Sequence, residues 1–213
     1  MSERLRIAIT KGRLLDQSME LFEGAGLDCS PIRNPGRRLV HCVPNYPLDA
    51  VLAKAPDVIT YVEHGVCDLG IVGKDTILEK GGSFYEVLDL GFGKCRFALA
   101  VRQGSDFYGT YKTRRIASKY PEVTRSFFAQ KGMDVDIIKI EGSVELAPIL
   151  DLADAIVDIV ETGATLKANG LVPIEDVAPV SARLIVNTAS MKLYKSQIED
   201  FIARCEGELE KRT

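Results

Sequence analysis

The fold is decided by a stretch in the second half of the chain, Asp154-Ala-Ile-Val-Asp158-Ile-Val-Glu161-Thr162-Gly163-Ala164-Thr165-Leu166. Its apolar run, Ala155–Val160, predicts a buried strand. A turn of small and hydroxyl residues follows, and a short helix is expected over Thr162–Asn169. Strands and helices alternate in the same way along most of the 213 residues. This alternation predicts an α/β fold with largely parallel sheets.

The turn Thr162–Thr165 has the composition of a phosphate-binding loop. Ligands of parallel sheets bind beyond the carboxyl ends of the strands. Backbone N–H groups, two hydroxyls and the start of a helix can point at one phosphate there, and Gly163 has no Cβ to keep it away. Glu161 can accept hydrogen bonds from two ribose hydroxyls. The turn therefore indicates a ribose 5-phosphate site, and the simpler alternative is a capped helix after a buried strand.

Two glycines in the middle of the chain, Gly91 and Gly93, mark a point where it can cross between two lobes. Helices are predicted at residues 14–25, 74–80, 123–130, 144–152 (with Ser143 as the N-cap) and 195–211. Further strands are predicted at 5–9, 39–43, 57–62, 68–72, 88–90, 97–101, 116–117, 135–140 and 183–188, and near 177.

Composition narrows the class of protein. The chain has 27 basic and 30 acidic residues, a net charge of -3, so charge gives no indication of a nucleic-acid partner. Its five widely spaced cysteines contain no CxxC pair, which argues against a disulfide framework or a zinc site. His41 and His64 are not at metal-ligand spacing, and we interpret both as non-catalytic. With no signal peptide and no apolar run of about 20 residues, a cytoplasmic protein is expected.

The stretch around the turn Thr162–Thr165 resembles the motif with which phosphoribosyltransferases bind phosphoribosyl pyrophosphate (PRPP), in the form seen in ATP phosphoribosyltransferases. Three other segments resemble signatures of that family in the same order. They are Thr10–Leu14, Tyr61–Gly65 with Asp68–Asp75, and Gly142–Pro148. The resemblance extends from about Leu5 to Asn187, nearly the whole chain.

The resemblance implies two α/β lobes similar to periplasmic binding proteins, with the active site in the cleft between them. We expect residues 1–92 and 181–213 to form lobe I, and 93–180 to form lobe II with the phosphate-binding turn. The implied reaction is the first step of histidine biosynthesis, in which N1 of the ATP adenine attacks C1 of PRPP and pyrophosphate leaves. Mg²⁺ is the implied cofactor, held mainly by substrate phosphates and water rather than by protein ligands.

The resemblance also assigns roles to residues. Arg13 and Arg37 are the candidate catalytic residues, because fixed cations stabilise the charge that grows on departing pyrophosphate. The candidate PRPP-binding residues are Glu145, Asp158, Glu161, Thr162, Gly163, Ala164 and Thr165. The candidate ATP-binding residues are Lys11, Gly12, Arg13, Asp68 and Gly73.

Several of these residues have simpler explanations. Arg37 is otherwise a solvated charge in a loop, and Glu145 a carboxylate that favours a helix N-terminus. Asp158 either supports the site or faces solvent at a sheet edge. The segment Asp68–Gly73 reads equally as a buried strand and a turn.

Only 25 residues follow Thr188, so we expect no C-terminal regulatory domain. The resemblance then implies a separate regulatory subunit similar to histidyl-tRNA synthetase, and a homodimer within a hetero-oligomer. The helix from Lys195 either offers a partner surface or packs on its own lobe. A solute-binding protein of the same fold and a PRPP-dependent transferase acting on another base are the alternative functions.

Overall fold

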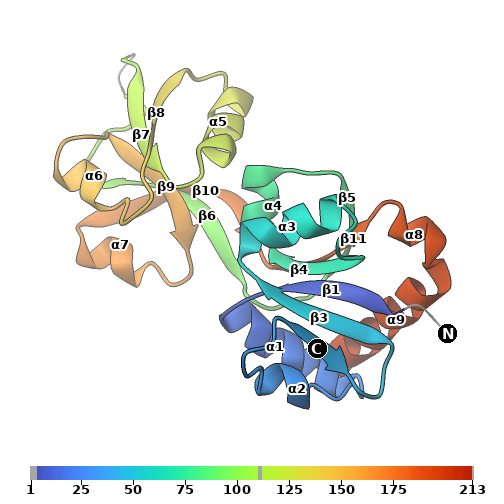
Figure 1. Ribbon diagram of the computed structural model, residues 1–213. Helices are drawn as coiled ribbons and strands as arrows, with labels where there is room; N and C mark the ends of the chain where they lie inside the picture. The colour runs from blue at the N-terminus through green and yellow to red at the C-terminus, as the bar shows by residue number, and fades with distance from the viewer. Residues whose placement is uncertain (1–3, 110–111, 213) are drawn as a thin grey trace. The chain divides into compact units, whose positions relative to one another are not determined.

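The chain folds into two compact units, seen in a computed structural model that describes residues 4–109 and 112–212. The first unit comprises Met1–Gly93 and Ser181–Thr213, and the second comprises Lys94–Val180. Each unit has its own sheet with helices on both faces (Figure 1). The chain therefore leaves the first unit after Gly93 and returns to it for its last strand and last helices.

The first unit is built on a six-stranded sheet with the order β2-β3-β1-β4-β11-β5. The three strands β3, β1 and β4 run parallel to one another, and the other pairings in this sheet are antiparallel. The sheet is thus mixed, with a parallel centre. The strands are β1 (Leu5–Thr10), β2 (Val40–Val43), β3 (Leu48–Ala53), β4 (Leu69–Gly73), β5 (Phe84–Asp89) and β11 (Ala182–Asn187).

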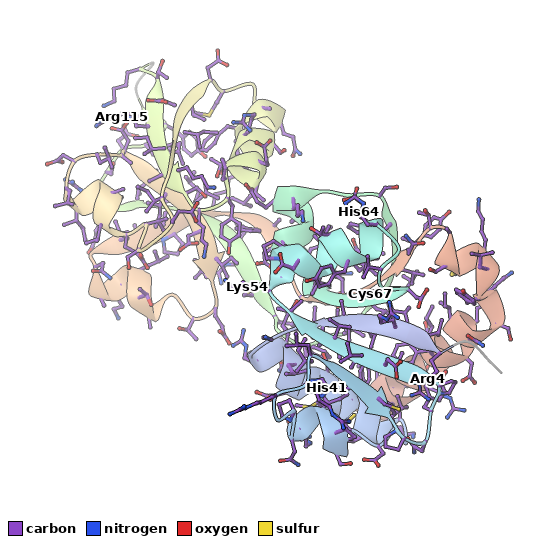
Figure 2. The ribbon with its side chains drawn as sticks, in the orientation of Figure 1. Arg4, His41, Lys54, His64, Cys67 and Arg115 are labelled. Carbon is purple, nitrogen blue, oxygen red and sulfur yellow. The ribbon has the colours of Figure 1, made fainter. Side chains whose placement is uncertain are left out.

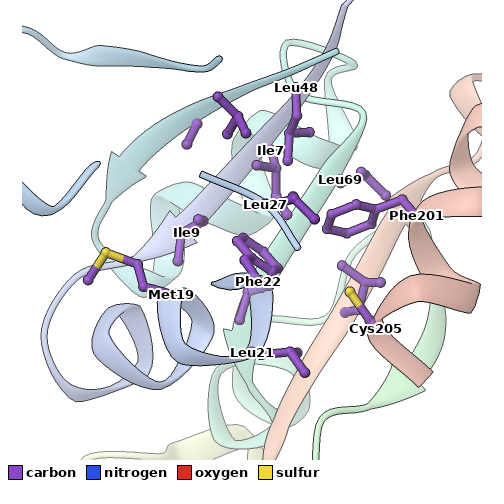
Figure 3. Packing of buried hydrophobic residues seen from close by; sticks show 14 of the residues in the cluster. Ile7, Ile9, Met19, Leu21, Phe22, Leu27, Leu48, Leu69, Phe201 and Cys205 are labelled. Atoms are coloured by element: carbon purple, nitrogen blue, oxygen red, sulfur yellow. The ribbon is translucent and has the colours of Figure 1, made fainter. Parts of the chain in front are cut away.

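Alternation along β1 gives this sheet two apolar faces. Ile7 and Ile9 point to one face, where they pack with residues of the first and last helices, while Ala8 points to the other (Figure 3). On the first face Phe22 meets Phe201 edge-on, with ring centroids 5.4 Å apart. The helices are α1 (Arg13–Gly24), α2 (Ser30–Arg33), α3 (Ala55–Glu63), α4 (Lys74–Lys80), α8 (Ser190–Leu193) and α9 (Lys195–Lys211).

The terminal helix α9 uses its apolar face within its own unit. Ile198, Phe201 and Cys205 recur at helical spacing, and all three are buried in the core beside α1. The sequence left open whether this helix offers a partner surface or packs on its own lobe, and the structure shows that it packs on its own unit. Among the described residues no helix combines the length and the apolar character needed to cross a membrane.

One predicted strand is a helix. Residues 57–62 lie in α3, which begins at Ala55, carries a proline in its first turn and has Asp57 there as well. The buried side chains Val58, Ile59 and Val62 have helical spacing, and they pack against the face of the sheet opposite α1. A short apolar run does not distinguish a buried strand from one turn of a buried helix, which is why the prediction was wrong.

The second unit has a five-stranded sheet with the order β10-β6-β9-β7-β8. Here β9, β7 and β8 are parallel, and β6 and β10 add antiparallel strands. The helix α5 (Pro121–Gln130) covers one face, and α6 (Leu146–Ile149) and α7 (Ala164–Ala168) cover the other. The strands are β6 (Cys95–Arg102), β7 (Arg114–Ser118), β8 (Val135–Lys139), β9 (Ala155–Val160) and β10 (Leu171–Val180).

The helix α6 is much shorter than predicted. It was expected over 144–152 with Ser143 as its cap, but it begins after Glu145, which makes no capping hydrogen bond through its side chain. It ends early because Asp151 adopts a left-handed conformation, with a φ of 58°. The N–H of Leu152 then donates to the carbonyl of Ala147 at 2.9 Å, the closing bond of a helix C-terminus.

Candidate active site

A hollow of about 300 Å³ lies at the carboxyl end of β9 in the second unit. The turn that follows β9 forms much of its wall, and Glu145, at the start of α6, closes it from a neighbouring connection. The sheet therefore brings together residues that are distant in the chain, from Glu145 to Leu166. All of the predicted PRPP-binding residues line this hollow, namely Glu145, Asp158, Glu161, Thr162, Gly163, Ala164 and Thr165.

The turn has the backbone that a phosphate site needs. Gly163 adopts a left-handed conformation (φ 78°, ψ 4°) directly before α7. The Thr162 hydroxyl accepts a hydrogen bond from Ala164 N–H at 3.3 Å. Because α7 spans only Ala164–Ala168, its dipole is small, and the N–H groups of its first turn are the stronger attraction for an anion. The predicted helix Thr162–Asn169 thus starts two residues late, and these two residues form the turn.

The carboxylates give the hollow an acidic side. Asp158 is half-buried on β9, and burial raises its pKa above the ordinary aspartate value, with the charge of Glu145 adding to the effect. The N–H of Ile159 and the cation Lys119 act in the opposite direction. Asp158 therefore faces this hollow from within the sheet, which decides between the two positions that the sequence left open.

Lys119 is a functional candidate that the sequence reasoning missed. It directly follows β7, which runs parallel to β9 with Ser118 opposite Val157. The register places Lys119 opposite Asp158, at the same end of the sheet as the hollow. The sequence contained an indication of this residue, because the basic Lys119 comes shortly after the strand predicted at 116–117.

A second group of predicted residues gathers at the carboxyl ends of the parallel strands in the first unit. Lys11 follows β1, and its N–H donates to the carbonyl of Ala53 at the end of β3. Gly12 has a φ of 89° and opens α1, whose first residue is Arg13. Gly73 ends β4, and a Cβ there would lie 2.0 Å from Asp75 Oδ1, the end of a side chain that would have to move away.

Arg37 lies in an exposed loop, residues 34–39, between α2 and β2. The antiparallel register places Val40 opposite Val51, near the carboxyl end of β3. The loop therefore belongs to the same edge of the sheet as Lys11. Here Arg37, Arg38 and His41 line a hollow of about 460 Å³.

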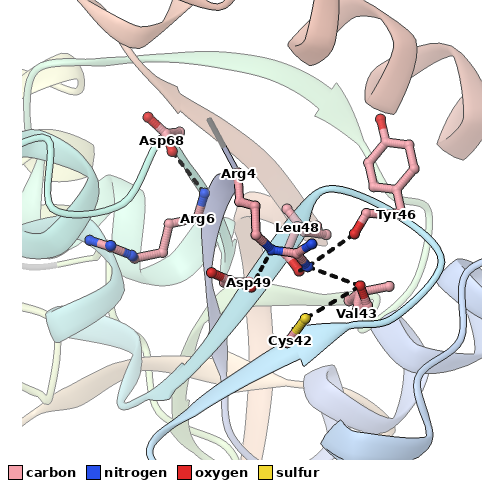
Figure 4. A network of polar contacts seen from close by, with 8 residues as sticks. All are labelled: Arg4, Arg6, Cys42, Val43, Tyr46, Leu48, Asp49 and Asp68. Atoms are coloured by element: carbon pink, nitrogen blue, oxygen red, sulfur yellow. Dashed lines mark hydrogen bonds and ion pairs between the residues drawn. The ribbon is translucent and has the colours of Figure 1, made fainter. Parts of the chain in front are cut away.

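Asp68 lies apart from the other predicted ATP-binding residues. It precedes β4, whereas Gly73 ends it, so the two are about 16 Å apart along the strand. One carboxylate oxygen of Asp68 accepts from the N–H of Arg6 at 2.7 Å (Figure 4). The other accepts from the hydroxyl of Ser190 at 2.7 Å. These contacts join β1, β4 and α8 at the amino end of the sheet, and the role of Asp68 in binding ATP stays a prediction.

The two histidines lie on different elements, as Figure 2 shows: His41 is on β2 and His64 follows α3. Within residues 4–109 and 112–212 no three side chains of His, Cys, Asp or Glu are grouped closely enough to hold a metal ion.

Comparison with known proteins identifies the family to which this chain is similar. A sequence model described as ATP phosphoribosyltransferase (HisG) matches residues 54–207, which include β4, the hollow at the end of β9 and most of α9. The chain belongs to the ATP phosphoribosyltransferase family. Curated members include one from Clostridium kluyveri, 58% identical over 97% of this chain and 94% of its own length. Another, from Clostridium acetobutylicum, is 56% identical over 100% of this chain and 99% of its own.

Solved structures agree on the fold of this family member. The ATP phosphoribosyl transferase (HisG:HisZ) complex from Thermotoga maritima matches with a TM-score of 0.82 and 32% identity, over 97% of this chain and 99% of the matched one. The periplasmic aliphatic sulphonate binding protein SsuA from Escherichia coli matches with a TM-score of 0.62 and 14% identity, over 98% of this chain and 73% of its own. The second likeness concerns the fold alone and confirms the predicted resemblance to periplasmic binding proteins.

Proposed function

We propose that this chain transfers the phosphoribosyl group of PRPP to N1 of the ATP adenine and releases pyrophosphate, the first step of histidine biosynthesis. The observation that carries the proposal is the hollow at the end of β9, where all of the residues predicted to bind PRPP converge. Membership of the ATP phosphoribosyltransferase family supports the same reaction.

The residues of the hollow divide the work of binding PRPP. The N–H groups of the turn Thr162–Thr165 and its two hydroxyls hold the 5-phosphate, to which the left-handed Gly163 gives a close approach. Glu161 accepts hydrogen bonds from the ribose hydroxyls. Asp158 and Glu145 line the same hollow, and their negative charge is proposed to stabilise the positive charge that an oxocarbenium-like transition state develops at C1.

The leaving pyrophosphate needs cations. Arg13 and Arg37 are the proposed catalytic residues, because a guanidinium binds phosphate oxygens in a bidentate manner. Lys11, Gly12 and Gly73 lie at the same edge of the first sheet and are proposed to hold ATP. No general base is required, since N1 of adenine carries its own lone pair.

Mg²⁺ is the proposed cofactor, and when bound it would neutralise negative charge on the pyrophosphate. The acidic side of the hollow, formed by Asp158 and Glu145, is compatible with a cation brought in on the substrate. Substrate oxygens and water provide most of its ligands in this proposal.

A regulatory subunit similar to histidyl-tRNA synthetase is the proposed partner of a homodimer of this chain. The Thermotoga protein was solved as a complex of HisG with HisZ, and this chain covers 99% of the matched chain in it. Association of this kind is consistent with a cytoplasmic enzyme, which is the proposed location.

The test is an absorbance assay for phosphoribosyl-ATP with ATP, PRPP and Mg²⁺, in the presence and absence of the candidate regulatory subunit. Product in either mixture supports the reaction, and the difference between the mixtures measures dependence on the partner. PRPP binding without product in both would favour a transferase acting on another base. The variants Thr162→Ala and Glu161→Ala should weaken PRPP binding, and unchanged affinity would contradict the assignment of the turn.

A further inference from the structure

A second polar hollow, of about 320 Å³, lies at the opposite end of the same sheet. Asp154, which lines it, directly precedes β9, whereas Glu161 of the first hollow directly follows that strand. The six residues of β9 separate the two hollows by about 20 Å. Nothing in the proposed phosphoribosyl transfer uses this second hollow.

Its distinguishing feature is a buried cation without a carboxylate partner. Arg114, the first residue of β7, is only 8% exposed, and it lines the hollow. Its guanidinium packs over the ring of Phe107, 5.3 Å from the centroid, and one Nη2–H donates to the carbonyl of Asp106 at 3.0 Å. Its Nε–H is buried, and it has no acceptor among residues 4–109 and 112–212. A guanidinium has five N–H donors, so most of the donors of Arg114 are available to a group other than the protein.

The nearby carboxylates are already engaged by other cations. Asp154 accepts from Lys112 Nζ at 3.0 Å and from the N–H of Arg115 at 2.9 Å. Asp151 accepts from Arg102 Nη2 at 2.7 Å. Buried charged groups are nearly always paired, because removing a charge from water is costly. Arg114 is the exception within the part of the chain described by the structure, which indicates an anion that comes from outside.

The surrounding groups favour a phosphoryl group over a carboxylate. Arg102 reaches the hollow from the end of β6, and Arg114 and Arg115 point to opposite faces of β7 (Arg115 is labelled in Figure 2). Several guanidiniums around one hollow can serve the tetrahedral oxygens of a phosphate, whereas a planar carboxylate is satisfied by one bidentate guanidinium. Gly104, with a φ of 80°, forms a turn at the rim that leaves no Cβ in the way.

We propose that this hollow is a binding site for the phosphoryl group of a phosphate monoester, separate from the PRPP site. Arg114 is the central ligand, and Arg102 and Arg115, which pair with Asp151 and Asp154 at the same hollow, each offer further N–H donors. The site does not depend on the proposed catalytic function, because the two hollows share no lining residue.

The experiment is a titration of the full chain with inorganic phosphate, and then with ribose 5-phosphate, followed by the amide NMR shifts of two pairs of residues. Gly104 and Ser105 report on the second hollow, and Gly163 and Thr165 report on the PRPP turn. We expect saturable shifts in both pairs. Arg114→Gln should weaken the response at Gly104 and Ser105 about tenfold or more, the strength of a charge-assisted hydrogen bond, and leave the PRPP turn unaffected.

Two further arms keep the test decisive. If Arg114→Gln does not fold, Arg102→Gln replaces it, because Arg102 is exposed and should also weaken the response at Gly104. The matched control is Arg96→Gln, a half-buried arginine near the start of β6, which also carries Arg102, and it pairs with Asp176 away from the hollow. An equal response to chloride at the same ionic strength, or no response at Gly104 in the unmodified chain, would overturn the proposal.

Discussion

Replacing Gly163 with alanine separates the stability of the turn from its use in binding phosphate. The φ of 78° lies in the left-handed region, which costs a residue with a Cβ about 1–2 kcal/mol. The new Cβ would meet Val160 Cγ1 at 3.8 Å, an ordinary contact, so no steric term is added. At about 2–4 °C per kcal/mol for a protein of this size, Tm should fall by about 2–8 °C.

The effect on PRPP binding should be much larger than this loss of stability. PRPP at about 100 times its Kd should stabilise the unmodified chain by about 2.7 kcal/mol. In Gly163→Ala most of that gain should disappear, because the added methyl group would lie on the turn that is proposed to hold the 5-phosphate. Thermal unfolding with and without PRPP measures both quantities.

The matched control for this variant is Gly170→Ala. Gly170 has a φ of 68° just beyond α7, and a Cβ there would meet nothing within 4 Å. It should lose the same stability as Gly163→Ala and keep the full response to PRPP. If both variants retain that response, the turn does not hold the phosphate, and the reasoning from Gly163 is wrong.

Three other substitutions test separate parts of the argument. Because the pKa of Asp158 is raised, its ionisation costs the fold stability that is lost as the pH rises from the ordinary aspartate pKa to the raised one. Asp158→Asn should therefore unfold at higher urea at pH 7, with the difference vanishing near pH 4, while PRPP affinity falls; equal stability at both pH values would contradict this. Arg37→Ala should lower kcat by about 10²–10³ with an unchanged Tm, because Arg37 is exposed, and an unchanged kcat would remove it from the catalytic residues. Phe201→Ala should cost about 3–5 kcal/mol in urea unfolding, because its ring is buried against Phe22, and a much smaller loss would contradict the packing of α9.

The sequence predicted strongly patterned elements well. The strand Ala155–Val160, the helix at 74–80 and the terminal helix at 195–211 have the predicted bounds in the structure. Each has a clear start or stop, such as the two glycines after Lys80. The errors fall where local pattern is weak: residues 57–62 have too few apolar positions to fix a period, and Leu48–Ala53 of β3 was not predicted at all.

For the candidate site, the sequence predicted the residues of one continuous segment but not the neighbours supplied by the fold. The turn Thr162–Thr165 and Glu161 are adjacent in the chain, so their proximity needed no tertiary information. Lys119 comes near enough to act on Asp158 only through the parallel pairing of β7 with β9, a non-local contact. Asp68 is the opposite case, because residues of one family signature lie at both ends of β4 although they are close in the chain. Only the structure shows that the carboxylate of Asp68 accepts hydrogen bonds from Arg6 and Ser190.

The charges of the hollow imply that substrate binding and folding are linked. Asp158 carries a raised pKa because it is partly buried and because Glu145 is near, so at neutral pH the free protein holds two carboxylates in an unfavourable arrangement. Substrate hydroxyls that donate to these oxygens, and a cation that accompanies pyrophosphate, would relieve that cost. Part of the stabilisation by PRPP should therefore come from relief of this repulsion. That part should shrink as the pH falls toward the ordinary aspartate pKa, where protonation already relieves it.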